Sequence, residues 1–365
     1  MRSVASGIPI SRVTREGQVE RLGEWHHDSR TLKLEREGFP FLGPGHHVIE
    51  GELPWIFWDM APSGYLGLRL QQRYPELRLS TNPRDWTSAD VLRVLQQTGA
   101  DLAGNLLIGS ESVAAFRDHL PVREEVRQAI DAALHHSVNS GPPSSLGGER
   151  PKILLDSEAG AALIKFSPPI DTPQGRRWSD LLRVEALCAQ SLDTAGINSA
   201  DSHPSELRNR TLLMVLRFDR LERRGRIGTG SLYWLAMDRY GDVSLPAPEV
   251  MRRLADEGLV STADVETCRR VHAFSAAIGN NDAHLGNYGL LFDDHGRASL
   301  APIYDVLPMM LAPRNDELPD AYLKPLTGEI DPVVAPWVDA LVAAVEADSL
   351  ISAEFKTLWR RLVGR

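Results

Sequence analysis

The chain has 365 residues and a formal net charge of −9, with 42% hydrophobic and 24% charged residues. This is the length and composition of a globular chain of about two domains, which excludes disorder over most of its length. Two cysteines exclude a disulfide scaffold, and the acidic balance excludes a surface coated with positive charge for nucleic acid. No apolar signal follows Met1, and the apolar stretch Val333–Val345 is too short to span a membrane, so we expect a cytoplasmic protein.

The first 60 residues contain short apolar runs separated by glycine and proline, a pattern that predicts small strands and turns. The runs are Val19–Leu22, Phe39–Leu42 and Val48–Phe57.

Helical spacing of apolar residues follows in the next part of the chain. It predicts helices around Leu66–Tyr74, over Ser88–Gln97 with Ser88 as the N-cap, and over Glu124–His136. Between the last two, Leu106–Ile108 predicts a strand.

A segment rich in serine, glycine and proline, residues 137–151, predicts a loop before a β-hairpin. The hairpin strands are expected at Ile153–Asp156 and Ala161–Phe166. Helical spacing predicts a helix over Ser179–Leu192, and the run Leu212–Phe218 is typical of a buried strand.

The remainder of the chain is mostly helical in pattern. Helices are expected over Pro248–Glu257, Ala263–Ile278 and Trp337–Leu362, the last with a break near Asp348. We therefore predict an α+β fold of two lobes, with a mixed α/β lobe at 1–215 and a mainly helical lobe at 216–365.

The strongest chemical pattern lies at residues 278–308. Asp282 and Asn287 are five positions apart with His284 between them, and Asp305 follows a predicted hairpin at 290–300. Phosphoryl transfer needs such a set: one carboxylate to orient the attacking hydroxyl, and an amide oxygen and a second carboxylate to hold a metal ion. Alternatively, the segment is a polar loop between a helix and a strand, capped by Asp and Asn side chains.

A phosphate cradle and a lysine would complete such a site. Gly147 and Gly148 leave backbone N–H groups accessible to phosphate oxygens, and Lys165 lies on the second strand of the predicted hairpin. A surface linker is the alternative for the glycine loop. Glu185, on the next predicted helix, would pair with Lys165 in such a site, but the pattern favours an ordinary exposed helix position.

These segments together resemble the HipA-family serine/threonine kinases, the toxins of type II toxin–antitoxin modules. The resemblance rests on SSLGGERPK at 144–152, LIKFSP at 163–168, RVEALCAQSLDTAGI at 183–197, RFDR at 217–220, NNDAHLGN at 280–287 and LAPIYDVLP at 300–308. In the first part of the chain, LPWIFWDMAPSGYLG at 53–67 and TGADLAGNLLI at 98–108 are also similar. The resemblance runs from about residue 15 to about residue 360 and implies a kinase-like fold.

The resemblance also implies a role for each matching residue. Asp282 would be the catalytic base, His284 would support its loop, and Asn287 and Asp305 would hold Mg²⁺. ATP phosphates would be contacted by Lys165 and by a phosphate-binding loop that contains Gly147, Gly148 and Lys152.

A serine before the glycines of this loop is autophosphorylated in the family, which inactivates the kinase. Ser145 matches that position best, and Ser144 is its neighbour. A phosphate there would add negative charge beside the ATP phosphates. Glu149 departs from the family pattern, because a carboxylate in a phosphate cradle repels the ligand unless it points away.

The resemblance thus implies an ATP- and Mg²⁺-dependent protein serine/threonine kinase that acts as a toxin on a translation component. Aminoacyl-tRNA synthetases are the family's targets. A separate antitoxin would be the partner, and DNA would be reached only through that antitoxin. Two alternatives stay open: a small-molecule phosphotransferase, and a catalytically idle partner in an antitoxin–DNA complex.

Overall fold

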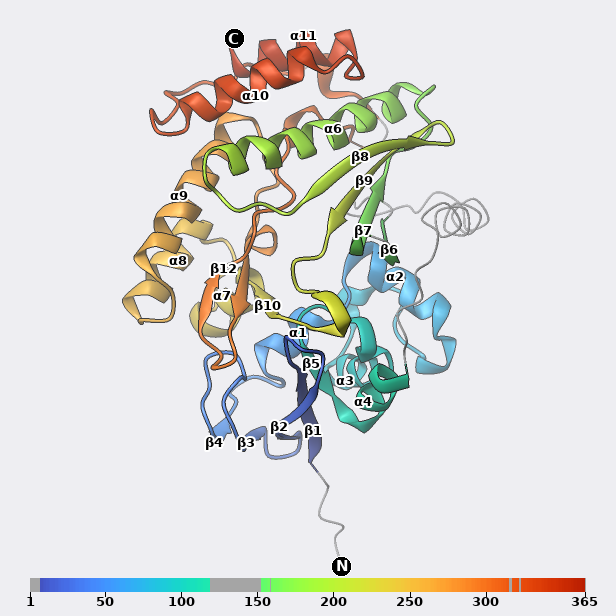
Figure 1. Ribbon diagram of the computed structural model, residues 1–365, viewed down its shortest axis with the longest axis vertical. Helices are drawn as coiled ribbons and strands as arrows, with labels where there is room; N and C mark the ends of the chain where they lie inside the picture. Colours follow the sequence, from blue (N-terminus) through green and yellow to red (C-terminus); the bar gives the residue numbers. More distant parts are fainter. Residues whose placement is uncertain (1–6, 119–151, 158, 315–316, 322, 365) are drawn as a thin grey trace, which may run out of the picture. The chain divides into compact units, whose positions relative to one another are not determined.

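The computed structural model describes residues 7–118, 152–157, 159–314, 317–321 and 323–364 (Figure 1). The chain forms two compact units, each assembled from three separate segments. Unit 1 comprises Met1–Val122, Phe218–Ser261 and Tyr288–Ala301, and unit 2 comprises Arg123–Arg217, Thr262–Asn287 and Pro302–Arg365. The segments of the two units alternate along the sequence. The two consecutive lobes expected from the sequence, 1–215 and 216–365, are a different division of the chain and stay a prediction.

Unit 1 contains a five-stranded antiparallel sheet of order β4-β3-β2-β1-β5. Its strands are β1 (Ile8–Val13), β2 (Val19–His26), β3 (Thr31–Leu34), β4 (Gly45–Val48) and β5 (Leu106–Ile108). Two helices, α3 (Ser88–Thr98) and α4 (Gly109–Asp118), pack against this sheet (Figure 1). Val13, Leu107 and Phe116 form a buried apolar cluster where α4 meets the sheet.

A second, three-stranded sheet in unit 1 has the order β10-β11-β12. Its strands are β10 (Gly228–Ser231), β11 (Gly289–Phe292) and β12 (Ala298–Leu300), which confirms the hairpin expected at 290–300. Gly296 turns this hairpin at a φ of +75°, a conformation that favours glycine. The helices α1 (Trp55–Met60), α2 (Gly64–Arg73), α7 (Leu232–Tyr240) and α8 (Ala247–Asp256) complete the unit.

Three predictions for unit 1 are wrong in detail. Phe39–Leu42 forms only an isolated bridge, and the run at 48–57 ends in helix α1 rather than in a strand. A short apolar run does not by itself distinguish a strand from a buried helix, and Trp55, Ile56 and Phe57 are all buried. The N-cap of α3 is Thr87, not Ser88, because the Thr87 hydroxyl and the Asp90 carboxylate bond each other's backbone N–H in a capping box.

Unit 2 is built on a four-stranded antiparallel sheet of order β6-β7-β9-β8. Its strands are β6 (Lys152–Ser157), β7 (Gly160–Phe166), β8 (Ser202–Leu207) and β9 (Arg210–Leu216), which confirms the hairpin expected at 153–166. The 22-residue helix α6 (Pro173–Thr194) runs along one face of the sheet (Figure 1). Alternate residues therefore have opposite environments: Leu213 packs against α6, whereas Leu212 belongs to a cluster with Ile164 and Phe166.

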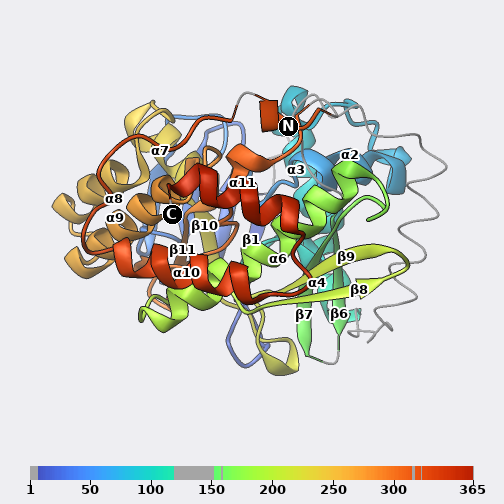
Figure 2. The ribbon, with the colours of Figure 1, turned by 90° about the horizontal axis from the view of Figure 1, so that it is seen from above.

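Among the described residues of unit 2, the other helices are α9 (Thr262–Ala277), α10 (Ala335–Ala347) and α11 (Ala353–Val363). The last two flank the expected break near Asp348 and lie beside α6 in both ribbon views (Figure 2). Asp180 of α6, which is fully buried, accepts hydrogen bonds from the backbone N–H and the hydroxyl of Ser352, the N-cap of α11. This carboxylate fixes the start of α11 against α6.

The predicted α+β class is confirmed, because both units combine sheets and helices. The helix expected over 124–136 lies outside the described residues. Among the residues that are described, no helix is both long and apolar enough to cross a bilayer.

Candidate active site

The position of Lys165 follows from the register of the unit 2 sheet. Lys165 on β7 pairs directly with Leu213 on β9, and Leu213 packs against Leu182 and Ala186 of α6. Residues paired across a ladder point to the same face, so the Lys165 side chain also faces α6. Only 15% of this side chain is exposed.

Glu185 of α6 is the first partner of this lysine. Its Oε1 accepts a hydrogen bond from Lys165 Nζ at 2.7 Å, and only 5% of its side chain is exposed. The expectation of an ordinary exposed helix position for Glu185 is therefore wrong. Its position in α6 places it against the sheet, where a carboxylate needs a cation.

Asp305 is the second partner, and it comes from a segment 140 residues away. Its Oδ1 accepts from Lys165 Nζ at 2.5 Å, so one ammonium group joins two carboxylates from α6 and from residues 303–306. The backbone of Asp305 has a φ of +61°, in the left-handed region that Asp tolerates better than most residues. Strained backbone of this kind concentrates at functional sites.

The charge state of the cluster follows from burial and from the three charges. Burial acts to lower the pKa of Lys165, but Asp305 and Glu185 outweigh it and the pKa is raised. Burial raises the pKa of Glu185 to about 7, although Lys165 acts in the opposite direction. Partial burial also opposes ionisation of Asp305, but Lys165, with help from Lys152 and His284, lowers its pKa. Asp305 is thus an ionised carboxylate at neutral pH.

The predicted catalytic loop begins where α9 ends. Gly279 has a φ of +76°, and the N–H of Asn280 bonds back to the carbonyl of Ser275, which closes the helix and redirects the chain. The Asn280 side chain then accepts from the N–H of Asp282 at 3.2 Å. Asp282 itself is exposed, so its carboxylate is accessible for the role predicted from the sequence.

Hydrogen bonds that each involve at least one main-chain atom hold the rest of this loop. The carbonyl of Asp282 accepts from the N–H of His284 and from Nδ2 of Asn287, both at 2.9 Å. His284 Nδ1 accepts from the N–H of Gly286 at 3.0 Å, which orients the ring. Because the Asn287 bond uses the amide nitrogen, it leaves the amide oxygen for the metal-binding role predicted from the sequence.

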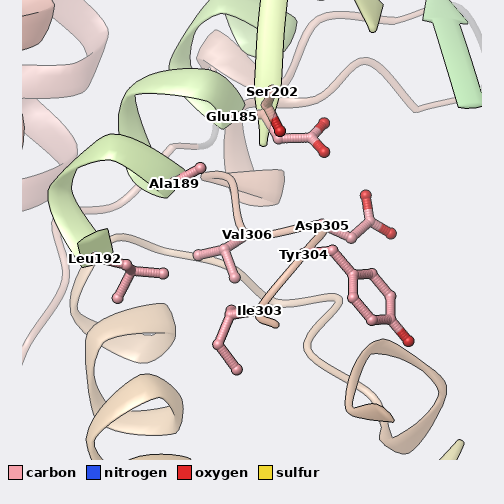
Figure 3. Close-up of a pocket in the computed structure, with 8 residues that line it drawn as sticks. All are labelled: Glu185, Ala189, Leu192, Ser202, Ile303, Tyr304, Asp305 and Val306. Atoms are coloured by element: carbon pink, nitrogen blue, oxygen red, sulfur yellow. The ribbon is translucent and has the colours of Figure 1, made fainter. Parts of the chain in front are cut away.

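Tyr304 connects this loop to the Asp305 segment. Its hydroxyl donates to the carbonyl of Gly286 at 3.0 Å. Tyr304, Glu185 and Asp305 are among the residues that line a small pocket in unit 2, shown in Figure 3. The other lining residues are Ala189, Leu192, Ser202, Ile303 and Val306.

Of the remaining site residues predicted from the sequence, the structure describes Lys152 alone. Lys152 begins β6 and pairs with Lys165 in the ladder, so the two lysines share a face, and its charge acts on Asp305 and Glu185. Ser144, Ser145, Gly147, Gly148 and Glu149 lie outside the described residues.

The donor set fits a magnesium ion. Mg²⁺ prefers oxygen ligands and is held by one or two protein groups together with substrate phosphates. Asn287 offers an amide oxygen, and Asp305 offers an ionised carboxylate whose second oxygen is not used in the Lys165 bond. Within the described ranges there is no cluster of three or more His, Cys, Asp or Glu side chains suited to a metal. A magnesium site formed by one amide oxygen, one carboxylate and substrate phosphates does not require such a cluster.

One residue of this site, Tyr304, was not identified from the sequence, and the burial of another, Glu185, was not expected. Glu185 stands among apolar neighbours, Val184, Ala186 and Cys188, all of which are buried. A charged residue within such a run is the signal that would have indicated a buried ion pair. Tyr304 gives no comparable signal, because a tyrosine beside an apolar run is equally well placed in a core.

Comparison with known families gives two matches. Residues 144–332, more than half of the chain, match the HipA-like C-terminal domain. Residues 4–117 match the middle domain of the YjjJ-like toxins. Together the two matches include all the site residues predicted from the sequence and most of unit 1.

Two curated relatives extend these matches. Toxin YjjJ of Escherichia coli (strain K12) is 30% identical over 275 residues, which are 72% of this chain and 61% of that protein. Y4mE of Sinorhizobium fredii (strain NBRC 101917 / NGR234), named as a candidate kinase, is 27% identical over 255 residues, 62% of this chain and 59% of that protein. The chain thus matches about three fifths of the length of these relatives.

The fold also matches a solved structure. A chain in the complex of the Shewanella oneidensis MR-1 toxin–antitoxin system HipA and HipB with its operator DNA superposes with a TM-score of 0.60. The match covers 98% of this chain and 96% of that chain at 16% sequence identity. At this identity the similarity describes the fold.

Proposed function

The chain belongs to the HipA-like family, and from this membership and the geometry of its site we propose that it is an ATP- and Mg²⁺-dependent protein serine/threonine kinase. The observation that carries the proposal is the single ammonium group of Lys165 between Glu185 and Asp305. A lysine on a strand, a glutamate on the following helix and a metal-binding aspartate are the groups that protein kinases assemble for phosphoryl transfer.

Each residue has a distinct task in the proposed reaction. Lys165 binds phosphate oxygens of ATP, and Glu185 holds the lysine in place. Asp282 accepts the proton of the attacking hydroxyl, whose oxygen forms the new bond to the γ-phosphorus. The bond from the γ-phosphorus to the bridging oxygen breaks, and ADP leaves. When bound by Asn287 and Asp305, Mg²⁺ would neutralise charge on the phosphate oxygens.

The biological role is part of the same proposal. We infer a toxin that phosphorylates a translation component such as an aminoacyl-tRNA synthetase, with a separate antitoxin as partner. Autophosphorylation of Ser145 or Ser144 would switch the kinase off, because a phosphate adds nearly two negative charges beside the ATP site. Likeness to the E. coli toxin and to the family supports this role.

Phosphate incorporation from labelled ATP and Mg²⁺ tests the proposed activity directly. Wild type should gain phosphate on Ser144 or Ser145 by intact mass and peptide mapping. Asp282→Asn should incorporate at least about a hundred-fold less, because loss of a positioned general base typically costs 10²–10⁴ in rate. Asp256→Asn removes an exposed carboxylate of α8 in unit 1 and should label like wild type.

Nucleotide binding by each variant provides the folding control. Asp282→Asn should still bind ATP, since Lys165 and Asp305 are intact. A wild-type chain that binds no ATP and gains no phosphate contradicts the kinase proposal. Labelling of small hydroxylated compounds, but of no protein, would instead favour a small-molecule phosphotransferase.

A further inference from the structure

The hydrogen bond from the Tyr304 hydroxyl to the carbonyl of Gly286 joins two segments of the proposed metal site. Gly286 directly precedes Asn287, and Tyr304 directly precedes Asp305. Each end of this one bond is therefore covalently attached to a proposed magnesium ligand. The bond spans 18 positions in the sequence and connects the catalytic loop to the segment at 303–306.

The Tyr304 end of the bond is well anchored in unit 2. The neighbouring Ile303 makes a parallel bridge to Ser199: its N–H donates to the carbonyl of Asn198 at 2.9 Å, and its carbonyl accepts from Ala200 at 2.8 Å. Ile303 is also buried, with 4% of its surface exposed. The backbone that carries Tyr304 and Asp305 thus has a fixed position beside the end of α6.

The Gly286 end lies in the loop at 282–287. Short-range bonds within this loop link Asp282 with His284 and Asn287, and His284 with Gly286 and Asn287. These bonds fix the shape of the loop, and backbone bonds on either side of it, such as Ala301 N–H to the Gly289 carbonyl, hold its ends. The Tyr304 hydroxyl adds a bond from inside the loop to the segment that carries Asp305.

We propose that Tyr304 is a positioning residue that sets the separation between Asn287 and Asp305 for the metal ion. The proposal rests on the kinase function proposed above. Tyr304 contacts neither metal nor nucleotide in this role and acts through the carbonyl of Gly286. Its loss would require the metal ion to order the two ligands itself, and the entropy of that ordering would weaken metal binding.

Tyr304→Phe tests this role, because it removes the hydroxyl and keeps the ring. Tyr240→Phe is the matched control, since it removes a hydroxyl that bonds Glu257 at 2.8 Å on the exposed surface of unit 1. Mn²⁺ binding is measured by electron paramagnetic resonance in the presence of a non-hydrolysable ATP analogue. Binding of the same analogue without metal and the thermal midpoint of the metal-free protein are measured alongside.

The expected result is a selective loss of metal affinity. Tyr304→Phe should bind Mn²⁺ about 3- to 10-fold more weakly, as for the loss of one hydrogen bond, with metal-free analogue binding unchanged. In kinase assays the metal concentration at half-maximal rate should rise by the same factor, while the rate at saturating metal stays near the wild-type rate. Tyr240→Phe should match wild type in every measurement.

Two results would overturn the inference, and a third would overturn the proposed function on which it rests. One is a Tyr304→Phe protein that binds Mn²⁺ as tightly as wild type. Another is a protein that loses metal-free analogue binding and thermal stability as much as metal affinity, which would make Tyr304 a purely structural residue. Tyr304→Met, which keeps an apolar side chain, repeats the measurement if the phenylalanine variant folds poorly. A wild-type chain that binds neither analogue nor Mn²⁺ overturns the proposed function itself.

Discussion

Lys165 joins two carboxylates of unit 2 through one ammonium group. It lies between Glu185, whose side chain is 5% exposed, and Asp305, whose side chain is 39% exposed. Removing one member of a buried ion pair leaves an uncompensated charge, which costs more than the pair contributes. The cluster therefore has a structural task beside the functional one that we propose for it.

Lys165→Met should lower the unfolding free energy of the protein by about 3 kcal/mol, the usual cost of breaking a buried pair. Adding Glu185→Gln should recover part of that loss, because it removes the stranded carboxylate. Lys324→Met, at an exposed position of unit 2, is the control and should change stability little. Urea denaturation followed by circular dichroism measures all three, and a single variant as stable as the double variant would contradict the argument.

The cost of Lys165→Met should also depend on pH. Burial already raises the pKa of Glu185 from 4.5 to about 7, and loss of the cation would raise it further. A carboxyl with a raised folded pKa contributes stability below its unfolded pKa, and that stability is lost as the pH rises through the folded pKa. The variant should therefore lose more stability at about pH 8.5 than at about pH 5.5. Equal losses at both pH values would show that Glu185 does not titrate in this range.

At the scale of elements, the start of α3 offers a test of local structure. Thr87 and Asp90 form a capping box, and Asp90 also pairs with Arg93. Thr87→Ala should reduce the stability of unit 1 by about 1 kcal/mol, because it leaves a helix N–H without its side-chain partner. Ser88→Ala, one residue on, should change stability by less than about 0.5 kcal/mol. The reverse order in thermal denaturation would restore Ser88 as the cap.

Several elements could be predicted from the sequence because their signals are local. The hairpin of β6 and β7 has apolar runs on either side of a short turn with Gly160, and β11 and β12 flank a turn with Gly296. The break between α10 and α11 follows from a polar segment at Asp348. In the candidate site, the spacing of Asp282, Asn287 and Asp305 pointed to phosphoryl transfer, and that chemistry stays a prediction.

Other features could not be predicted, because they depend on contacts between distant residues. Strand β10 pairs with β11 across about sixty positions, and nothing in GTGS at 228–231 marks it as a strand. Helix α4 has no clear apolar periodicity. The burial of Glu185 depends on which face of α6 meets the sheet, and the partner of Tyr304 is a backbone atom that no sequence pattern reveals.

At the scale of the whole molecule, the interleaving of the two units should control folding. Residues 1–215 contain α6 and all but the last residue of the unit 2 sheet, but α9, α10 and α11 of the same unit lie in residues 216–365. Each fragment therefore exposes apolar surface that the other would cover. We expect neither fragment alone to show cooperative thermal unfolding, and co-expression to restore it. A fragment with a sharp transition of its own would support consecutive lobes divided at 215/216.

The separation of Lys165 and Asp305 by 140 residues also has a consequence in time. A ribosome adds about 5–20 residues per second, so Asp305 is made roughly 7 to 28 seconds after Lys165. During that interval the nascent chain has the lysine and its glutamate but neither the catalytic loop nor the second carboxylate. The chain thus acquires the second carboxylate of this cluster only after β7 and α6 have been made, so the three charges cannot meet while those two elements are first folding.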